Sequence, residues 1–430
     1  MTTAQVGYEP VYRWVKKVLG RTHTTVIVTV AWAVLCLLVA QRVTPAALAR
    51  ALPAEQAGSG RSCLRRVRRW WSGPALEQAT ISPALIRLAL ALLAAGQPVV
   101  VALDTTRLGC WEVWVAGIVV SGRTLPIGWA VLPYPWPKGR FRTTTLALVQ
   151  QLQRAFPAGV RWTLVADRGF PSAVLFGQLR HGGTDFSVRL RLSDWVTVAG
   201  VSATVAEHLE ARRLVVGQRR VASMGRGRPD QPLVPGWVVV STAVAAPPKH
   251  KQNPGTVRER AKRAKAHAQH RAHKQGHKTK PPSAAVQRYA QTWVLFTTAQ
   301  TVEQAVAEYA QRMSIEETFR DWHSGWGVRV AVVDLPTEAM VDRLIGVICL
   351  TYSLQMHLGQ RVSTDPVGQQ RRVQWTVTDR VSWFWCSQRL FDDPGYEWSA
   401  WLAQQWASLG QSVTAPQAAS VSEAVLEKAA

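Results

Sequence analysis

Acidic residues are scarce in this 430-residue chain, which has 27 Asp and Glu against 51 Lys and Arg, a formal net charge of +24. A surface that meets only solvent does not require such an excess, and the excess repels itself. The imbalance therefore indicates a polyanionic partner, with nucleic acid as the first candidate and an anionic membrane surface as the second. The scarcity also gives weight to any acids that recur in an ordered pattern.

Cysteine is likewise rare. The chain has five cysteines, an odd number with no Cys-x2-Cys pair, at Cys36, Cys63, Cys110, Cys349 and Cys386. This arrangement argues against a disulfide framework and against a Cys-ligated zinc site, and it is typical of a protein from a reducing cytoplasm.

One uncharged, almost wholly apolar segment, residues 24–40, stands against a cytoplasmic location. Its 17 residues are at the short limit for a bilayer span, and the preceding 23 residues are long for the basic region of a signal peptide. We therefore expect a buried helix in an N-terminal helical region and no membrane insertion.

The segment after it contains two further predicted helices. Thr44 is a suitable N-cap for the first. The second, within residues 60–73, ends in Trp70 and Trp71 and carries five arginines: Arg61, Arg65, Arg66, Arg68 and Arg69. Helices ending in an Arg-rich one are typical of a DNA-docking module, although the same run also fits a solvated surface.

From residue 98 the pattern changes to strands, and two of them lead into an Asp. An apolar run in PVVVALDTTRL is followed by Asp104, and the run in RWTLVADRGF is followed by Asp167. Alternating segments between them predict antiparallel strands and a helix, so we expect a mixed α/β sheet. Each Asp alone is an ordinary turn residue. Two carboxylates at neighbouring strand ends would instead need a cation to offset their repulsion, and a hard divalent ion has that property.

A third acid is found in the stretch YAQRMSIEETFRDWHSG. Tyr309, Arg312, Glu316, Arg320 and His323 are spaced three or four residues apart, which predicts one face of a single helix. The alternative is a surface helix with ordinary ion pairs. Two metal ions held by three acids can stabilise both the attacking and the departing oxygen of a phosphodiester, which makes Glu316 the candidate for the third acid.

These motifs resemble those of the DDE transposases of bacterial insertion sequences, in the branch with a Tyr-x2-Arg-x3-Glu-x6-Lys signature. Tyr309, Arg312 and Glu316 match its spacing, while His323 stands at the position of the Lys. The contexts ALDTT, ADRGF and IEETFR are also similar to those of the family. The resemblance implies an α/β, ribonuclease-H-like mixed-sheet catalytic core with a β-rich insertion, an N-terminal helical DNA-binding region and C-terminal helices.

The resemblance also implies the following organisation of the chain. Asp167 and Glu316 are separated by roughly 150 positions, far more than a sheet crossover needs, so an insertion is expected between them. Its basic stretch, residues 249–280, holds eleven Lys or Arg, five His and one acid. We expect a mobile phosphate-binding loop there in preference to a metal site. The predicted regions are 1–96 (helical, DNA-binding), 97–185 (first part of the core), 186–291 (β-rich insertion), 292–353 (second part of the core) and 354–430 (helical).

By the same resemblance, Asp104, Asp167 and Glu316 are the catalytic acids and hold two Mg2+ ions, for which Mn2+ can substitute. Tyr309 and Arg312 are expected to bind phosphates near the transposon end, and Trp293 to stack on a flipped base, with core packing as its alternative. His323, or Arg320 in its place, would provide the missing cation, and Glu317 would be a surface acid paired with Arg320.

The predicted function is therefore that of a cytoplasmic, nucleoid-associated transposase. It would bind double-stranded transposon ends and target DNA, act as a homodimer on paired ends, and catalyse metal-dependent strand cleavage and strand transfer. A DDE-fold nuclease without strand transfer would carry the same acids. An inactive DNA-binding derivative would be expected to have lost one of them, and a membrane-surface protein leaves the three acids unexplained.

Overall fold

The computed structural model describes residues 7–20, 22–53, 59–73, 76, 78–225, 232–242, 292–333, 335–365, 369, 382–392 and 405. The basic stretch 249–280, predicted to be a mobile phosphate-binding loop, lies outside these residues. The chain forms two compact units. The first comprises Met1–Ala166, Gln178–Asp185 and Gln311–Ala430, and the second comprises Asp167–Gly177 and Phe186–Ala310.

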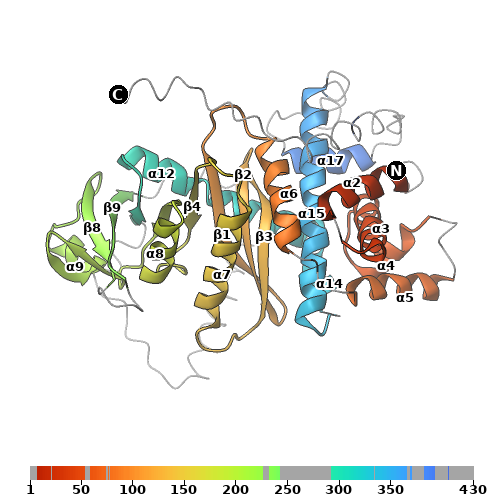
Figure 1. Cartoon of the computed structure of the whole chain (residues 1–430), viewed down its shortest axis with the longest axis horizontal. Coiled ribbons are helices and arrows are strands. Elements are labelled where there is room, and N and C mark those ends of the chain that lie inside the picture. Colours follow the sequence, from red (N-terminus) through yellow and green to blue (C-terminus); the bar gives the residue numbers. More distant parts are fainter. Residues whose placement is uncertain are drawn as a thin grey trace, which may run out of the picture. The chain divides into compact units, whose positions relative to one another are not determined.

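The first unit begins with helices, as the sequence predicts (Figure 1). They are α2 (Tyr8–Leu19), α3 (Thr24–Ala40), α4 (Pro45–Arg50), α5 (Gly60–Trp71) and α6 (Gln78–Leu90). The apolar segment 24–40 is α3, and most of its side chains are buried, several of them completely. Thr44 is the N-cap of α4 by position, with Pro45 in the first turn. These helices belong to the same compact unit as the strands that follow.

The sheet of the first unit has the order β3-β2-β1-β4. Strands β1 (Val99–Leu108), β2 (Trp111–Val120) and β3 (Arg123–Pro133) form an antiparallel meander, and β4 (Trp162–Ala166) pairs in parallel with β1 after helix α7 (Arg140–Ala155). All ten residues of β2 are buried, which is typical of a strand covered on both faces. The predicted mixed α/β architecture is confirmed.

After the insertion the chain returns to the first unit through α13 (Met313–Arg320), a π-helical turn η1 (Asp321–Gly325), α14 (Val328–Val332), α15 (Glu338–Thr364) and α17 (Trp383–Asp392). Thr337 caps α15 by accepting a hydrogen bond from the backbone N–H of Met340 at 3.3 Å. Helix α15 runs through residues 353 and 354, so the predicted boundary between core and C-terminal region falls inside a continuous helix. The sequence break is not visible because the helix remains apolar on both sides of it.

One described helix, α15, is long and apolar enough to cross a membrane by length and composition alone. Of its 18-residue apolar window, 83% is buried inside the protein, and the helix contacts β3, α3 and α17. These contacts are those of a core helix.

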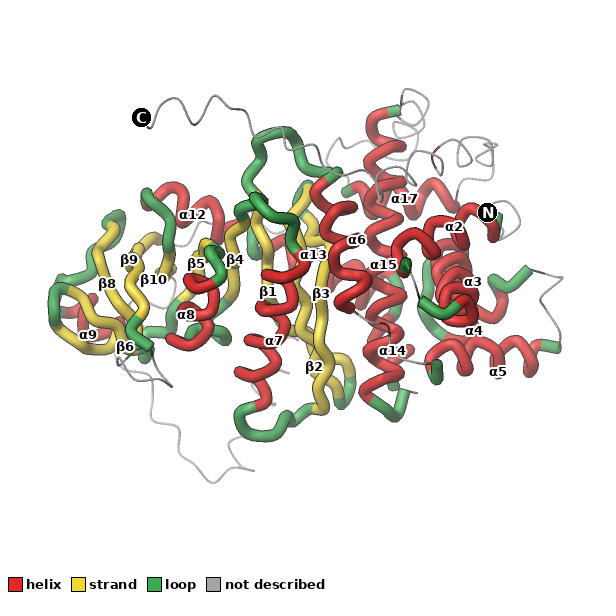
Figure 2. The backbone as a smooth tube through the Cα atoms, viewed as in Figure 1, coloured by secondary structure: helices red, strands yellow, loops and turns green. Residues whose placement is uncertain are grey.

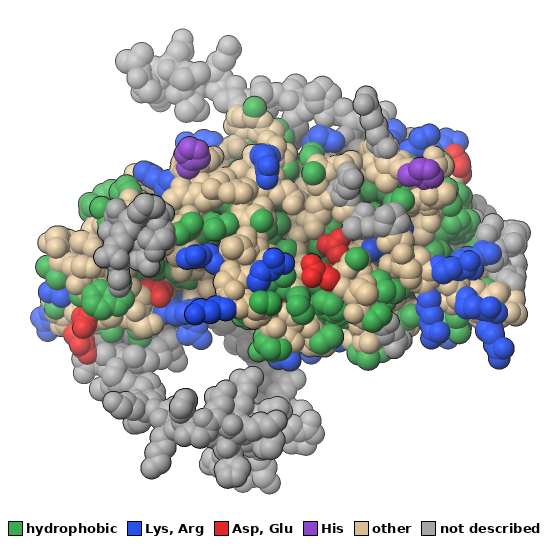
Figure 3. Space-filling view, turned by 60° about the horizontal axis from the view of Figure 1, so that its bottom comes forward, with side chains coloured by type: hydrophobic (Ala, Val, Ile, Leu, Met, Phe, Trp, Pro, Cys, Tyr) green, Lys and Arg blue, Asp and Glu red, His purple; other side chains and the backbone are tan. Residues whose placement is uncertain are grey.

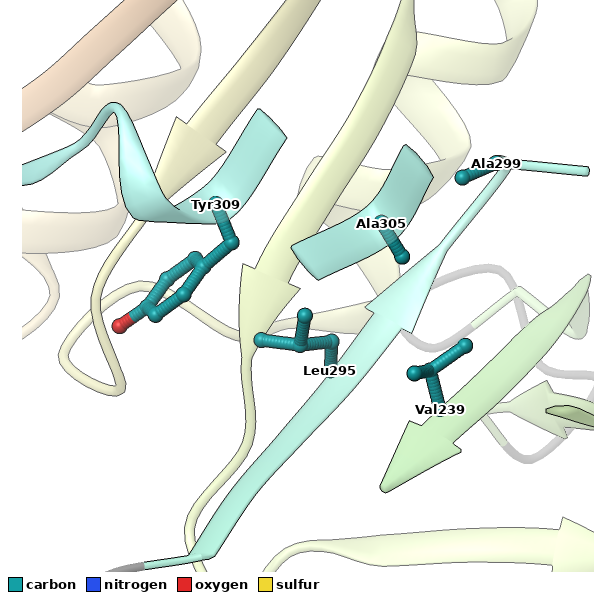
Figure 4. Close-up of a cluster of buried hydrophobic side chains, with 5 residues drawn as sticks. All are labelled: Val239, Leu295, Ala299, Ala305 and Tyr309. Carbon is teal, nitrogen blue, oxygen red and sulfur yellow. The ribbon is translucent and has the colours of Figure 1, made fainter. Parts of the chain in front are cut away.

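The second unit contains an antiparallel set of strands in the order β5-β10-β9-β8-β6-β7, seen as yellow tubes in Figure 2. The strands are β5 (Asp185–Arg189, of which Phe186 onward belongs to this unit), β6 (Trp195–Val198), β7 (Val201–Thr204), β8 (Arg219–Met224), β9 (Val234–Thr242) and β10 (Thr292–Thr297). Helix α8 (Ala173–His181) begins in it, and helices α9 (Val205–Glu210) and α12 (Val302–Ala310) lie within it. Helix α12 packs over β9 and β10 through a cluster comprising Val239, Leu295, Ala299, Ala305 and Tyr309 (Figure 4).

Two details of the expected insertion are wrong. The segment RRLVVGQRRVA, residues 212–222, predicts one strand, but Arg212 and Gly217 both have positive φ, so the chain turns there and β8 starts at Arg219. Helix α9 was not expected; it starts at a capping box in which Thr204 and Glu207 bond each other's backbone N–H groups.

Candidate active site

Asp104 lies inside strand β1 and not at its end, which corrects the expectation from sequence. The parallel pairing of β1 with β4 ends at Leu103 and Ala166, and Asp104 follows directly. Beyond that point β1 continues to Leu108 because it stays paired with β2. The carboxylate is thus carried by a rigid strand at the position where the parallel neighbour stops. Asp167 is the next residue after Ala166 in the chain.

Arg312 connects Asp104 to Glu316. Its Nη1 donates to Asp104 Oδ2 at 2.9 Å, and its Nη2 donates to Glu316 Oε1 at 2.8 Å. The Arg312 side chain is only 8% exposed, whereas those of Asp104 and Glu316 are 21% and 45% exposed. The structure therefore brings two of the three predicted catalytic acids to one buried cation.

The helix that presents Glu316 is shorter than predicted. Residues 309–323 do not form one continuous helix, because α12 ends at Ala310 and α13 starts at Met313. Between them Ser314 N–H bonds Gln311 O and Ile315 N–H bonds Arg312 O, three residues back, which makes this turn tighter than an α-helix. Arg312 and Glu316 keep their four-residue spacing across the start of α13 and so remain on one side of it.

The oxygens gathered around Arg312 are of the type that hard divalent ions prefer. Among the residues that the structure describes, no three His, Cys, Asp or Glu side chains are grouped as metal ligands. Asp104 and Glu316 nevertheless converge on a single positive group from two different elements, a strand and a helix. Carboxylates are ligands of the type that a divalent ion takes, and in this structure the guanidinium of Arg312 offsets the charge of these two.

Tyr309 and Asp167 are in contact within the second unit. The Tyr309 hydroxyl donates to Asp167 Oδ1 at 3.2 Å, and the Tyr309 ring is 2% exposed. Trp293 packs edge-on against this ring, with centroids 4.9 Å apart, and belongs to the margin of the hydrophobic cluster in Figure 4. Trp293 is partly buried, and its predicted role in base stacking stays a prediction.

His323 has a different environment from the one expected of a DNA-binding cation. Its Nε2 lies 2.9 Å from Thr106 Oγ1, on β1 two residues beyond Asp104. Burial, and secondly the charge of Arg329, lower the pKa of His323 to about 4. In the protein without DNA the imidazole is therefore neutral at neutral pH, and the charge of His323 in the presence of DNA stays a prediction.

Arg320, the other candidate for the missing cation, forms an ion pair with Glu317 on the exposed side of α13. This confirms the predicted pairing of Glu317 and separates it from Glu316, whose partner is Arg312.

A buried network that the sequence did not indicate anchors the end of this segment. Arg123 Nε bonds Asp321 Oδ2 at 2.8 Å, and the Tyr352 hydroxyl donates to the same oxygen at 2.9 Å. Burial raises the pKa of Asp321, and Arg123 offsets only part of that effect. Thr318 adds a bond from the backbone N–H of Thr124 at 2.8 Å. The contacts of Arg123 and Thr124 hold η1 and α13 against β3. They join residues 198 and 194 positions apart, so no local pattern in the sequence indicates them.

The predicted arginines of α5 lie mostly on its surface. Arg65, Arg68 and Arg69 are exposed and Arg66 is half-buried, while Val67, Trp70 and Trp71 are buried on the other side. Lys and Arg side chains gather at the right-hand end of the surface in Figure 3, where α5 lies in Figure 1. This is an amphipathic helix with a basic face, as expected both for a DNA-docking helix and for a solvated one.

Comparison with known proteins identifies the class. The family model of the transposase DDE domain matches residues 118–354, which is more than half of the chain. The chain therefore belongs to the transposase DDE domain family, whose members are enzymes that act on DNA and generally use divalent metal ions. The match includes Asp167 and Glu316 and begins after Asp104. The comparison with curated proteins gave no match.

Proposed function

We propose that this protein is the transposase of a bacterial insertion sequence, of the branch with the Tyr-x2-Arg-x3-Glu-x6-Lys signature, and that it cleaves DNA at the ends of its element and joins them to a target. The observation that supports this most is the convergence of Asp104 and Glu316, which are 212 positions apart, on the signature residue Arg312. An ordinary ion pair on a surface helix does not account for the contact with Asp104, which lies on strand β1.

We further propose that Asp167 completes the catalytic set. Leu103 and Ala166 are register partners on adjacent parallel strands, and Asp104 and Asp167 are the residues that follow them. The Tyr309 hydroxyl, which donates to Asp167, would orient that carboxylate. Mg2+ or Mn2+ held by these acids would activate the attacking hydroxyl and stabilise the departing oxygen.

DNA would be bound by basic groups outside this site. Arg65, Arg68 and Arg69 on α5 are exposed and able to contact phosphates, and they position DNA without reading its sequence. Homodimerisation on paired ends, and residence in the cytoplasm at the nucleoid, are part of the same proposal.

The experiment compares Asp104→Asn, Asp167→Asn and Glu316→Gln with wild type on labelled DNA that carries the flanking inverted repeats. Each variant should lose metal-dependent cleavage and keep end binding, because removing one ligand disables the metal site while Lys and Arg elsewhere supply the affinity. Glu317→Gln is the matched control on the same helix, since Glu317 pairs outward with Arg320, and it should cleave like wild type.

Cleavage at the wild-type rate by any of the three variants would remove that residue from the site. Product analysis separates the second candidate: a DDE-fold nuclease would yield cut ends that are never joined to target DNA.

A further inference from the structure

We propose that Arg312 is an internal counter-cation that holds Asp104 and Glu316 together in the absence of metal and is displaced when a divalent ion binds. Displacement would free its guanidinium for a DNA phosphate. This inference rests on the proposed function, because it assumes that the two acids are metal ligands. It adds a coupling between metal binding and DNA binding at that site.

The geometry of the contacts shows why one cation would replace the other. The guanidinium uses two different nitrogens, Nη1 for Asp104 and Nη2 for Glu316, and so stands between the two carboxylates. A divalent ion ligated by the same oxygens would lie within a few ångströms of the guanidinium. A divalent ion and a guanidinium that close together repel each other strongly in a partly buried site, so both cations would not share the two carboxylates.

The exposure of the three groups indicates that the exchange is feasible. Glu316 is 45% exposed and Asp104 is 21% exposed, so water and ions can reach their oxygens. Glu316 also lies on α13, one turn from Arg312, where side-chain rotation alone can break the contact. Solvent therefore reaches the two carboxylates of this ion-pair network, unlike those of an ion pair enclosed in the core.

The burial of Arg312 gives the displaced group a preference for DNA. A guanidinium that is 8% exposed is costly when its charge is not offset, so a further anion would stabilise it once the carboxylates bind the metal ion. A phosphate provides one and accepts the same two-pronged hydrogen bonds as a carboxylate. Metal binding and DNA binding would then favour each other, and the coupling would be reciprocal.

The test measures Mn2+ binding without DNA by isothermal titration calorimetry, for wild type, Arg312→Met and Arg320→Met. Arg312→Met should bind Mn2+ about tenfold more tightly than wild type, because the ion no longer competes with a cation for its ligands. Arg320→Met removes the same charge from the same helix but contacts Glu317 and not the site. It should stay within about twofold of wild type, as expected for a screened surface charge.

A second measurement follows the coupling itself. Wild-type affinity for a short random-sequence duplex should increase severalfold when Ca2+ is added, and this increase should be absent in Arg312→Met. Arg312→Lys keeps the charge without the planar fork and should bind Mn2+ with an affinity between those of wild type and Arg312→Met. It also guards against a folding defect in the neutral variant, since it leaves a cation beside both carboxylates.

The possible outcomes distinguish a failure of the proposed displacement of Arg312 from a failure of the proposed metal site. If wild type binds Mn2+ and Asp104→Asn weakens that binding, but Arg312→Met binds no more tightly than wild type, then Arg312 is a permanent structural bridge and the inference is wrong. If wild type and Asp104→Asn bind Mn2+ equally or not at all, the proposed metal site fails and the inference fails with it.

Discussion

Asp342 provides a prediction about stability whose sign is unusual, since removing its charge should make the protein more stable. Its Oδ1 accepts hydrogen bonds from the indole of Trp129 at 2.9 Å and from Gln78 at 3.4 Å, both neutral donors. Burial raises its pKa from 3.8 to about 6, and these bonds offset only part of the rise. The carboxylate lines a groove of about 430 Å³ together with Glu338 and Arg140.

The magnitude follows from the change in pKa. Because the pKa in the folded state is above the value in the unfolded chain, protonation favours the folded state, and the contribution is lost as pH rises from about 4 through about 6. Ionised Asp342 then costs the native state about 3 kcal/mol at pH values above about 7, taking 1.36 kcal/mol for each pKa unit. In Asp342→Asn the amide oxygen can keep the bonds from Trp129 and Gln78 while the charge is absent.

The assay is urea unfolding of wild type and Asp342→Asn at about pH 5 and about pH 8. The free energy of unfolding of the variant should exceed that of wild type by about 3 kcal/mol at the higher pH and by clearly less at the lower. Glu338→Gln, an exposed acid on the same groove, should change it by less than about 0.5 kcal/mol at either pH. Equal stability of wild type and Asp342→Asn at pH 8, or a less stable variant, would refute the reasoning.

Asp321→Asn should have the opposite effect, because it leaves the buried Arg123 without its anion, and should lower the free energy of unfolding by about 3 kcal/mol at neutral pH. Chemical denaturation at about pH 7 measures this change, and a decrease below about 1 kcal/mol would contradict the prediction. His323 should destabilise the protein as pH falls from 6.5 to about 4, since the unfolded chain takes up that proton first. The ratio of the cleavage rate of His323→Lys to that of wild type should not change between about pH 6.5 and 8.5, because a neutral imidazole does not titrate there. A ratio that rises severalfold with pH would show instead that DNA restores the charge of His323.

Much of the fold was predictable because it depends on local pattern. The apolar run of α3, the meander of β1 to β3, α7 and the strand before Asp167 all follow from periodicity and turn residues. The prediction failed where long-range contacts decide the backbone. Strand β1 continues past Asp104 because β2 keeps pairing with it, and no feature of residues 99–108 alone indicates where the parallel neighbour β4 stops.

The candidate site was predictable in its residues and not in its contacts. The spacing of Tyr309, Arg312 and Glu316 is a local property that sequence records directly. The bond between Arg312 and Asp104 joins positions 208 apart, and no local pattern in the sequence indicates it. Arg312 and Arg320 are each four residues from Glu316, so only the burial of Arg312 beside Asp104 distinguishes the two arginines.

The resemblance predicts a Lys where this chain has His323, and the contacts of His323 give a physical reason for a neutral side chain there. A Lys at position 323 would place an ammonium near Thr106 on β1 and near Arg329, in a half-buried position where burial and a like charge both disfavour a cation. A neutral imidazole keeps the contact with Thr106 and thereby ties η1 to the strand that carries Asp104. Asp104 and Glu316 have a positive partner in Arg312, which lies between them. For the protein without DNA, position 323 is therefore better understood as aligning β1 with α13 than as contributing charge to the site.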